Sequence, residues 1–428
     1  MSAQRLLPSQ AKPRIGCILL WYPLFTQPFI FREIEGLKNF LPVTVYALYG
    51  KNLKHCSTEM QAAATTVSHH GITFLPHILA ALGKELVTNP KRLFGLFRRF
   101  LVKKWPSLEI FGENLWAFCM GLALAHKLKG QVDLLYAPWP RGTATAASVI
   151  HAIIGIPFGI TVRGDNLEPA DPDFTEKMKD CVFVRANNHA DQIRIEAYAD
   201  GIAAKKTQLI YNSLTLPKQN PPIHIATYTP KQTLKIMALG RFDVTKGFIT
   251  LIQACALLRE KNLNFSLTLA GGGGIIMGLG GLEKEIHALT AKLKLTQYIH
   301  FPGLISHNEL PSMLAQHDIF VAPCEIAPSG KRDGIPNTVI EAMSMGLPVV
   351  SSNIHALPEV VLNHQTGLTT NPHDPQALSA AILWLAQHPK DAADMGEKGR
   401  AHARALFDPE HNAQKLADLM QQSVQMKG

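Results

Sequence analysis

The chain has 428 residues, of which 46% are hydrophobic and 18% are charged. This composition excludes a disordered or fibrous chain, and at roughly 150 residues per domain the length predicts two or three globular domains. The formal net charge of +9 favours anionic partners such as nucleotides or anionic lipid headgroups. No aromatic and basic run typical of an RNA- or DNA-binding surface is present, so we expect no nucleic acid partner.

The cysteines and the termini indicate a reducing compartment. The six cysteines lie far apart and several stand in apolar runs, which predicts buried thiols. The first residues are polar and unlike a secretory signal, and no uninterrupted apolar stretch reaches the roughly 20 residues of a membrane span. We therefore expect a cytoplasmic protein, either soluble or peripheral on the inner face of the membrane.

The first half of the chain alternates short apolar runs with helical patterns. A strand is expected over residues 15–21, a helix begins near Pro28, and a second strand starts at Val43. Further on, residues 132–165 give strand, loop, helix and strand, ending in Arg163-Gly-Asp165. Such an alternation predicts a parallel sheet with helical crossovers.

Residues 91–105 (KRLFGLFRRFLVKKW) form an amphipathic pattern. At 100° per residue, one side of a helix over this stretch would be aromatic and aliphatic, and the other side would be basic. This pattern is typical of a helix in a membrane interface, and it also fits a core helix with a solvated basic face. We expect a candidate contact with an anionic membrane surface here and keep the core helix as the alternative.

The second half restarts the alternation after a segment rich in Pro, Thr and Lys. A strand is expected to end at Leu239, before a turn that carries Arg241 and Lys246. The glycines at 271–274 follow the next strand, without the spacing of a phosphate-binding or dinucleotide-binding loop. By themselves, a surface arginine and a surface lysine at such a turn are unremarkable.

The stretch from Val321 to Ser352 predicts a strand, a polar loop, a helix from about Pro336 and a second strand from Leu347. In a parallel sheet, ligands bind beyond the carboxyl ends of the strands, where the loop meets the next helix. The loop is rich in charged residues and Glu341 lies within the helix. These residue types suit a nucleotide sugar: cations for the diphosphate, and a carboxylate for the ribose.

The block D-G-I-P-N-T-V-I-E-A-M-S-M-G-L-P-V-V at 333–350 resembles the donor-site signature of the GT-B retaining glycosyltransferases of family 4. Asp333 stands where that family has glutamate. Arg241 and Lys246 match the family's G-R-x-x-x-x-K-G turn, and the loop around Phe25 resembles that of exopolysaccharide and lipopolysaccharide transferases. Arg163 stands where the family has the histidine of a His-Gly-x-Asp motif.

The resemblance implies a GT-B α/β fold of two doubly wound Rossmann-like domains facing across a cleft. Residues 1–215 would form the acceptor-side domain, 216–233 the linker and 234–408 the donor domain. Residues 409–428 would be a helix that crosses back to the N-terminal domain. The implied reaction moves a sugar, with retention, from a nucleoside-diphosphate sugar to a saccharide or lipid-linked acceptor in polysaccharide or glycoconjugate biosynthesis. Neither a metal nor another cofactor is expected.

The resemblance also implies roles for individual residues. The candidate catalytic residues are Arg241, Lys246, Asp333 and Arg163. The candidate donor-binding residues are Gly240, Arg241, Lys246, Gly272, Asp333, Gly334, Ile335, Pro336, Asn337 and Glu341. The candidate acceptor-side residues are Phe25, Thr26, Arg141 and Asp165.

Several alternatives remain open. Arg163 could simply pair with Asp165 at the end of a strand. The Asp171-Pro-Asp173 sequence looks like the metal-binding motif of another glycosyltransferase fold, but we interpret it as a turn. The whole chain could be a nucleotide-sugar-binding protein without turnover, or an epimerase or phosphorylase on the same fold, because a fold does not set a function.

Overall fold

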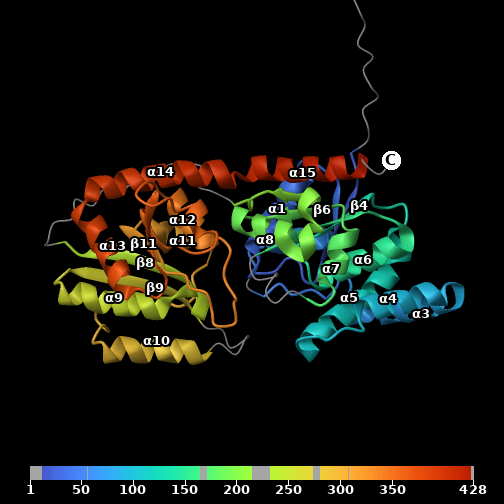
Figure 1. Cartoon of the computed structure of the whole chain (residues 1–428), viewed down its shortest axis with the longest axis horizontal. Helices are drawn as coiled ribbons and strands as arrows, with labels where there is room; N and C mark the ends of the chain where they lie inside the picture. Colours follow the sequence, from blue (N-terminus) through green and yellow to red (C-terminus); the bar gives the residue numbers. More distant parts are fainter. Residues whose placement is uncertain are drawn as a thin grey trace, which may run out of the picture. The chain divides into compact units, whose positions relative to one another are not determined.

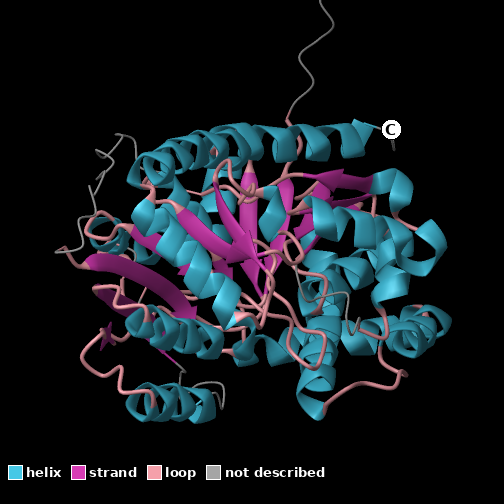
Figure 2. Ribbon diagram, turned by 60° about the vertical axis from the view of Figure 1, so that its left-hand side comes forward, coloured by secondary structure: helices cyan, strands magenta, loops and turns pink. Residues whose placement is uncertain are grey.

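The computed structural model describes residues 12–54, 56–163, 171–214, 232–272, 280–306 and 308–425. The chain divides into two compact units (Figure 1). The N-terminal unit comprises Met1–Asn187, Gln192–Ser213 and Pro409–Gly428, and the C-terminal unit comprises Asn188–Asp191 and Leu214–Asp408. In each unit, helices flank a set of parallel strands (Figure 2).

The N-terminal unit is built on a seven-stranded parallel sheet in the order β3-β2-β1-β4-β5-β6-β7. Its strands are β1 (Ile15–Leu19), β2 (Val43–Ala47), β3 (Ser68–His69), β4 (Leu134–Ala137), β5 (Phe158–Val162), β6 (Phe183–Ala186) and β7 (Thr207–Leu209). Its helices are α1 (Pro28–Lys38), α2 (Thr58–Ala63), α3 (Leu75–Thr88), α4 (Pro90–Phe100), α5 (Leu108–Leu128), α6 (Gly142–Ile154), α7 (Phe174–Asp180), α8 (His189–Ala197) and α15 (Pro409–Gln425), although the first residues of α8, up to Asp191, belong to the C-terminal unit. Short 3₁₀ turns follow α2 (Ala64–Thr66), precede α3 (Ile72–Phe74) and follow α8 (Tyr198–Gly201 and Ala204–Lys206).

The predicted opening of the chain is confirmed. β1 pairs with β2 in parallel from Ile15 opposite Val43, and α1 starts at Pro28, where a proline loses no helical hydrogen bond. The C-terminal helix α15 packs on α1, and its Leu416 and Met420 join the hydrophobic core on that face of the sheet. The last helix is therefore a structural part of the N-terminal unit.

The helix prediction over residues 91–105 is wrong at its C-terminal end. The side chain of Asn89 caps α4 and Phe100 is its last residue. Phe100 and Leu101, predicted to share one apolar face with Phe94, are buried in the core, whereas Phe94 is 70% exposed. The apolar residues thus divide between the core and the solvent, because the chain turns at Leu101 rather than continuing the helix.

Helix α5 is long and apolar enough, by length and composition, to cross a membrane. However, half of that stretch is buried inside the unit, where it packs along α6 and α3. Gly121 lies so close to the α6 backbone that a Cβ would be 2.9 Å from Ala146 O. This close packing identifies α5 as a core helix of the N-terminal unit.

The C-terminal unit has a six-stranded parallel sheet in the order β10-β9-β8-β11-β12-β13. Its strands are β8 (Leu234–Arg241), β9 (Phe265–Gly272), β10 (Ile299–His300), β11 (Ile319–Ala322), β12 (Val349–Ser352) and β13 (Gly367–Thr370). Its helices are α9 (Phe248–Glu260), α10 (Gly280–Lys292), α11 (Leu310–Leu314), α12 (Asn337–Ser344), α13 (Pro375–Gln387) and α14 (Pro389–Phe407), with 3₁₀ turns at Val244–Lys246 and Leu357–Glu359. The predicted unit of strand, loop, helix and strand around residues 321–352 is confirmed as β11, α12 and β12.

Gly247 is required by the turn between β8 and α9. Its φ is 63°, and a Cβ there would overlap the carbonyl oxygen of Pro323 after β11. Any side chain would therefore force two neighbouring strand ends apart.

We expect Gly247→Ala to lower the free energy of unfolding of its domain by about 2 kcal/mol or more, because it combines a left-handed backbone with a backbone overlap. Urea unfolding measures this change. Gly83→Ala, within α3, is the control. A Cβ at that position meets nothing within 4 Å, so this change should stabilise by roughly 0.5–1 kcal/mol. Equal effects of the two substitutions would contradict the prediction.

Candidate functional site

The carboxyl edge of the C-terminal sheet brings most of the predicted donor residues together. β9, β8 and β11 are neighbours, and Gly240 and Arg241 of β8 stand opposite Gly271 and Gly272 of β9. The strand β8 runs two residues beyond the predicted end at Leu239, so Arg241 is its last residue. The loop after β11 then carries Asp333 to the same edge.

The turn after β8 is held by two side chains that the sequence reading did not select. Asp243 Oδ1 accepts a hydrogen bond of 3.0 Å from the Thr245 N–H, and Lys331 Nζ lies 3.0 Å from Asp243 Oδ2. Burial opposes the ionisation of Asp243, but these donors prevail and lower its pKa to about 2. The Asx-turn pattern Asp-x-Thr before Lys246 was the sequence signal for this arrangement.

Lys246 and Asp333 form an ion pair at the centre of this edge. Lys246 Nζ lies 3.0 Å from Asp333 Oδ2, and the same oxygen is 3.0 Å from the Thr245 hydroxyl. Burial by itself would lower the pKa of Lys246, but the Asp333 carboxylate outweighs it and the pKa is raised. The ammonium group therefore stays charged, with 13% of the side chain accessible to a ligand.

Arg241 supplies a second cation next to this pair. Its positive charge acts on Lys246 and disfavours protonation of that group. Arg241 is exposed, and its guanidinium makes no hydrogen bond or ion pair within the described part of the chain. An exposed arginine beside a half-buried lysine can bind a diphosphate bidentately.

Glu341 lies on α12 without a partner. Its carboxyl group forms no hydrogen bond or ion pair with the residues that the structure describes, and the side chain is half-buried. Burial raises its pKa to about 7. Hydrogen bonds from hydroxyl groups would stabilise the charged form of this carboxyl group, so Glu341 is suited to bind a diol such as that of ribose.

The residues from Gly334 to Asn337 lead into the N-terminus of α12, where Pro336 is the N-cap. No side chain caps this end and its first turn carries no acidic residue. The Thr338 hydroxyl, 3.4 Å from Leu239 O, ties the first turn of the helix to β8. The helix start thus presents backbone N–H groups near the edge where Arg241 and Lys246 lie.

Glu325, in the same loop, has a structural role. Its carboxylate accepts a hydrogen bond of 2.5 Å from the Thr250 hydroxyl and lies 3.2 Å from His373. Its backbone N–H donates to Thr245 O over 2.9 Å. Glu325 therefore fastens the loop after β11 to α9 and to the turn that carries Lys246.

In the N-terminal unit, the predicted acceptor-side residues lie on loops at one edge of the sheet. Phe25 and Thr26 follow β1, Arg141 follows β4 and Arg163 follows β5. These three strands are neighbours, so their carboxyl ends meet. Asp165 lies outside the described residues.

Arg163 is buried within a group of charged and aromatic side chains. Its guanidinium donates to Glu33 Oε2 over 2.9 Å and to Asn212 Oδ1 over 2.5 Å. It also lies over the rings of Phe29 and Trp139, 5.1 and 5.5 Å from their centroids. These contacts orient the Arg163 guanidinium. As a cation, it cannot act as the neutral imidazole of the family's histidine would.

Glu33 neutralises two arginines in this group. Arg185 also contacts Glu33 Oε2, and the Tyr136 hydroxyl donates to Glu33 Oε1 over 2.6 Å. Burial opposes the ionisation of Glu33, but the two arginines prevail and lower its pKa to about 2. The carboxylate is therefore fully occupied by protein partners.

The carboxylates of the Asp171-Pro-Asp173 turn also have protein partners. Asp171 Oδ1 lies 3.5 Å from Arg141 Nε, and Asp173 Oδ1 lies 2.9 Å from Lys177 Nζ, with both of the latter side chains fully buried. The two acids thus serve the packing of α6 and α7, in agreement with their interpretation as a turn.

Three comparisons show which known proteins the chain is similar to. Residues 222–402 match the family model described as glycosyl transferases group 1. The amylovoran biosynthesis glycosyltransferase AmsK of Erwinia amylovora is 29% identical over 223 residues, 52% of either chain. A GDP-mannose-dependent alpha-(1-6)-phosphatidylinositol monomannoside mannosyltransferase of Mycolicibacterium smegmatis is 28% identical over 43% of this chain and 47% of its own. The chain thus spans about half the length of these relatives.

The solved structure of Anabaena Alr3699/HepE in complex with UDP and glucose aligns over 95% of this chain and 98% of its own, with a TM-score of 0.67 and 17% identity. This likeness establishes the GT-B fold, with its two parallel-sheet α/β domains. The fold class predicted from the sequence is confirmed.

The raised pKa of Glu341 predicts a pH-dependent stability. The pKa of the Glu341 carboxyl group is about 7 in the folded protein, against an ordinary value of 4.5. Between pH 4.5 and pH 7, the folded protein therefore binds more protons at this group than the unfolded protein does. Its stabilising contribution is therefore present below about pH 4.5 and is lost as the pH rises through 7. We expect Glu341→Gln to become more stable relative to wild type from pH 5 to pH 8 in urea unfolding. A parallel pH dependence of both proteins would contradict this assignment.

Proposed function

We propose that this chain, whose residues 222–402 belong to the glycosyl transferases group 1 family, is a retaining glycosyltransferase of the family 4 type. It would transfer a sugar from a nucleoside-diphosphate sugar to a saccharide or lipid-linked acceptor. The observation that carries the proposal is that Arg241 and Lys246 lie at the sheet edge where α12 begins. The same helix carries Glu341, whose carboxyl group has no partner among the described residues.

The two cations would stabilise the leaving nucleoside diphosphate. As the bond to the anomeric carbon breaks, negative charge grows on the β-phosphate, and preorganised cations lower the energy of that state. The N-terminus of α12 would add backbone N–H donors. Glu341 would accept hydrogen bonds from the ribose hydroxyls, and Gly240 and Gly272 would leave room for the ligand.

Asp333 would act mainly by orienting Lys246, which lies 3.0 Å from its carboxylate. Gly334, Ile335 and Asn337 would approach the sugar and phosphates through their backbone. Arg163 would serve the acceptor side as a fixed cation, beside Phe25, Thr26, Arg141 and Asp165.

The relatives give the range of substrates to test. AmsK is named for amylovoran biosynthesis, the Mycolicibacterium relative for GDP-mannose and a phosphatidylinositol monomannoside, and HepE was solved with UDP and glucose. We infer a UDP- or GDP-linked hexose as donor and an acceptor in polysaccharide or glycoconjugate biosynthesis.

Incubation with radiolabelled UDP- and GDP-sugars and lipid-linked saccharide acceptors tests the proposal. Release of nucleoside diphosphate, with a labelled saccharide whose anomeric configuration is retained by NMR, is the expected result. An altered nucleotide sugar without transfer would identify an epimerase, a sugar 1-phosphate would identify a phosphorylase, and binding without product would identify an inactive relative.

Lys246→Ala should lower kcat by about tenfold or more and change KM less, because the charge that Lys246 meets grows in the transition state. Steady-state kinetics with varied donor concentration measures this effect. Lys235→Ala, an exposed lysine at the start of β8, is the matched control and should retain activity. An increase in KM alone would restrict Lys246 to a ground-state contact.

We also propose that transfer needs no divalent metal, because Arg241 and Lys246 would neutralise the diphosphate in its place. Activity should survive dialysis against EDTA. A complete loss that only magnesium or manganese restores would refute this.

Finally, we propose that the protein acts in the cytoplasm and binds peripherally to the inner face of an anionic membrane through the surface around α4. Phe94 and Phe97 are exposed there, as are Lys91 and Arg98. Arg92 and Arg99, by contrast, pair with Glu85 and Glu176, so they serve the fold.

A further inference from the structure

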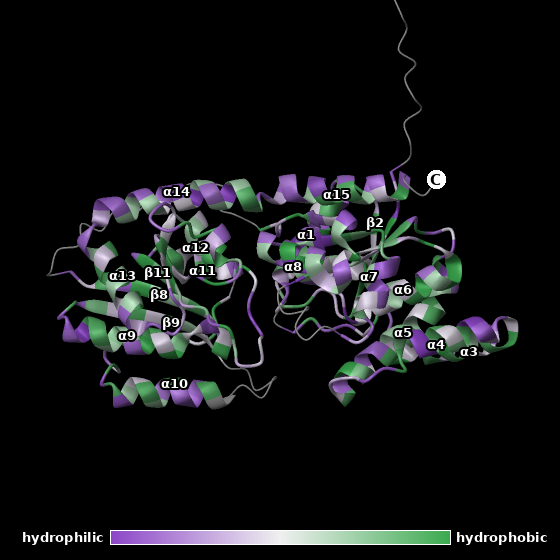
Figure 3. Ribbon diagram, in the orientation of Figure 1, coloured by the Kyte–Doolittle hydropathy of each residue, from purple (hydrophilic) through white to green (hydrophobic). Residues whose placement is uncertain are grey.

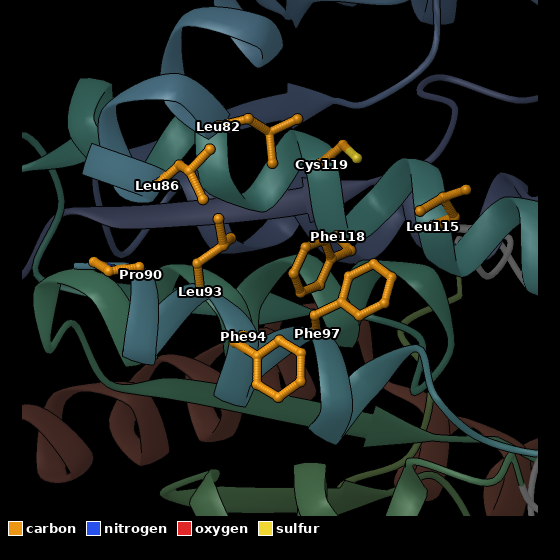
Figure 4. Close-up of a pocket in the computed structure, with 9 residues that line it drawn as sticks. All are labelled: Leu82, Leu86, Pro90, Leu93, Phe94, Phe97, Leu115, Phe118 and Cys119. Carbon is orange, nitrogen blue, oxygen red and sulfur yellow. The ribbon is translucent and has the colours of Figure 1, made fainter. Parts of the chain in front are cut away.

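An apolar pocket of about 350 Å³ lies between α3, α4 and α5 in the N-terminal unit (Figure 4). The lining residues are Leu82, Leu86, Pro90, Leu93, Phe94, Phe97, Leu115, Phe118 and Cys119. None of these side chains carries a charge. The pocket is separate from both groups of site residues described above.

Helical spacing explains why these side chains share one space. Leu82 and Leu86 lie one turn apart on α3, and Leu93 and Phe97 do so on α4. Phe118 of α5 is buried at the inner side, with its ring edge-on to Phe97 at 6.3 Å between centroids. Leu96 and Phe100 are the buried residues of α4, and Leu93 packs against the core from the wall of the pocket.

The mouth of the pocket is exposed and apolar. Leu86 is 62% and Phe94 is 70% exposed, and Leu79 and Val87 of α3 are also exposed. Figure 3 shows hydrophobic segments along α3 and α4. Exposed apolar surface of this kind marks an interaction site.

Basic residues border the mouth on one side. On a helical wheel, Lys91 and Arg98 fall about 40–60° beyond Phe94, on the flank of α4 that faces solvent. Neither makes a hydrogen bond or ion pair with the described residues, and α4 contains no acidic residue. An anion beside the mouth would thus meet two cations without competition from α4.

We propose that this pocket binds one hydrocarbon chain of an anionic membrane lipid, with Lys91 and Arg98 contacting the phosphate of its headgroup. The apolar walls of the pocket suit a hydrocarbon chain, and the basic residues beside its mouth suit an anionic headgroup. A membrane lipid has these two parts next to each other. A second copy of the chain fits less well, because a twofold contact through this face would bring the same basic residues together. The proposal extends the membrane association proposed above and is independent of sugar transfer.

The test uses the full chain with vesicles of phosphatidylcholine and phosphatidylglycerol. The phosphatidylglycerol includes a tracer with a diazirine on the last carbon of one acyl chain. Irradiation converts the diazirine to a carbene with loss of N₂, and the carbene inserts into a neighbouring C–H or S–H bond. Mass spectrometry should place the adducts at Leu82, Phe118 and Cys119.

Cys119→Trp fills the pocket and should reduce this labelling, per bound protein, at least tenfold. Leu86→Trp blocks the mouth and gives an independent second variant. Leu108→Trp is the matched control, because Leu108 is 88% exposed and lies outside the pocket, so labelling should persist. Urea unfolding and near-UV circular dichroism, compared across the variants, verify folding and do not depend on lipid or on the proposed donor site.

The double substitution Lys91→Glu with Arg98→Glu reverses both charges beside the mouth. It should lower the affinity of the protein for these vesicles at least tenfold. Adducts confined to exposed side chains such as Ile72 or Leu108 would overturn the pocket. Equal labelling in vesicles of phosphatidylcholine alone would overturn the headgroup contact. Dimers that Cys119→Trp abolishes, without lipid adducts, would assign the pocket to a second copy of the chain.

Discussion

The close approach of the turn after β8 to the end of β11 is the constraint on which the C-terminal site depends. Gly247 makes it feasible, because its lack of a side chain lets the backbone pass against the carbonyl group of Pro323. This contact brings Lys246 of the turn to Asp333 of the following loop, although the two residues are far apart in sequence. The Glu325 N–H to Thr245 O hydrogen bond holds the loop in this position, and the Thr338 hydroxyl ties the start of α12 to β8.

The carboxyl groups of Glu33 and Glu341 have opposite surroundings. In the N-terminal unit, Glu33 is satisfied by Arg163, Arg185 and Tyr136, so the cost of burying charge is offset within the protein. In the C-terminal unit, Glu341 has no partner among the described residues and its pKa is raised. A protein leaves a half-buried carboxyl group in that state at a cost in stability, and a ligand that supplies donors removes the cost. This contrast supports the proposal that the donor binds at the C-terminal sheet edge.

Local patterns in the sequence predicted the fold well. The alternation of apolar runs and helices predicted the parallel sheets, and Pro28 predicted the start of α1. The end of α4 at Phe100 was missed because the basic and aromatic pattern continues beyond it. The partners of Arg163 were missed as well, since Glu33 lies 130 residues away in sequence and only the sheet brings them together. The pocket could not be predicted, because it needs three helices whose packing no local pattern specifies.

The position of Asp333 depends on the loop that carries it. Aspartate lacks one methylene of the glutamate that the resembling family has, so on an unchanged backbone its carboxylate would fall short. Here the loop after β11 is drawn toward the turn by two contacts, the Glu325 N–H to Thr245 O and Lys331 Nζ to Asp243. With the backbone so held, the Asp333 carboxylate lies 3.0 Å from both Lys246 and Thr245. The loop and the substitution therefore form one unit, and a change at either would disturb the position of Lys246.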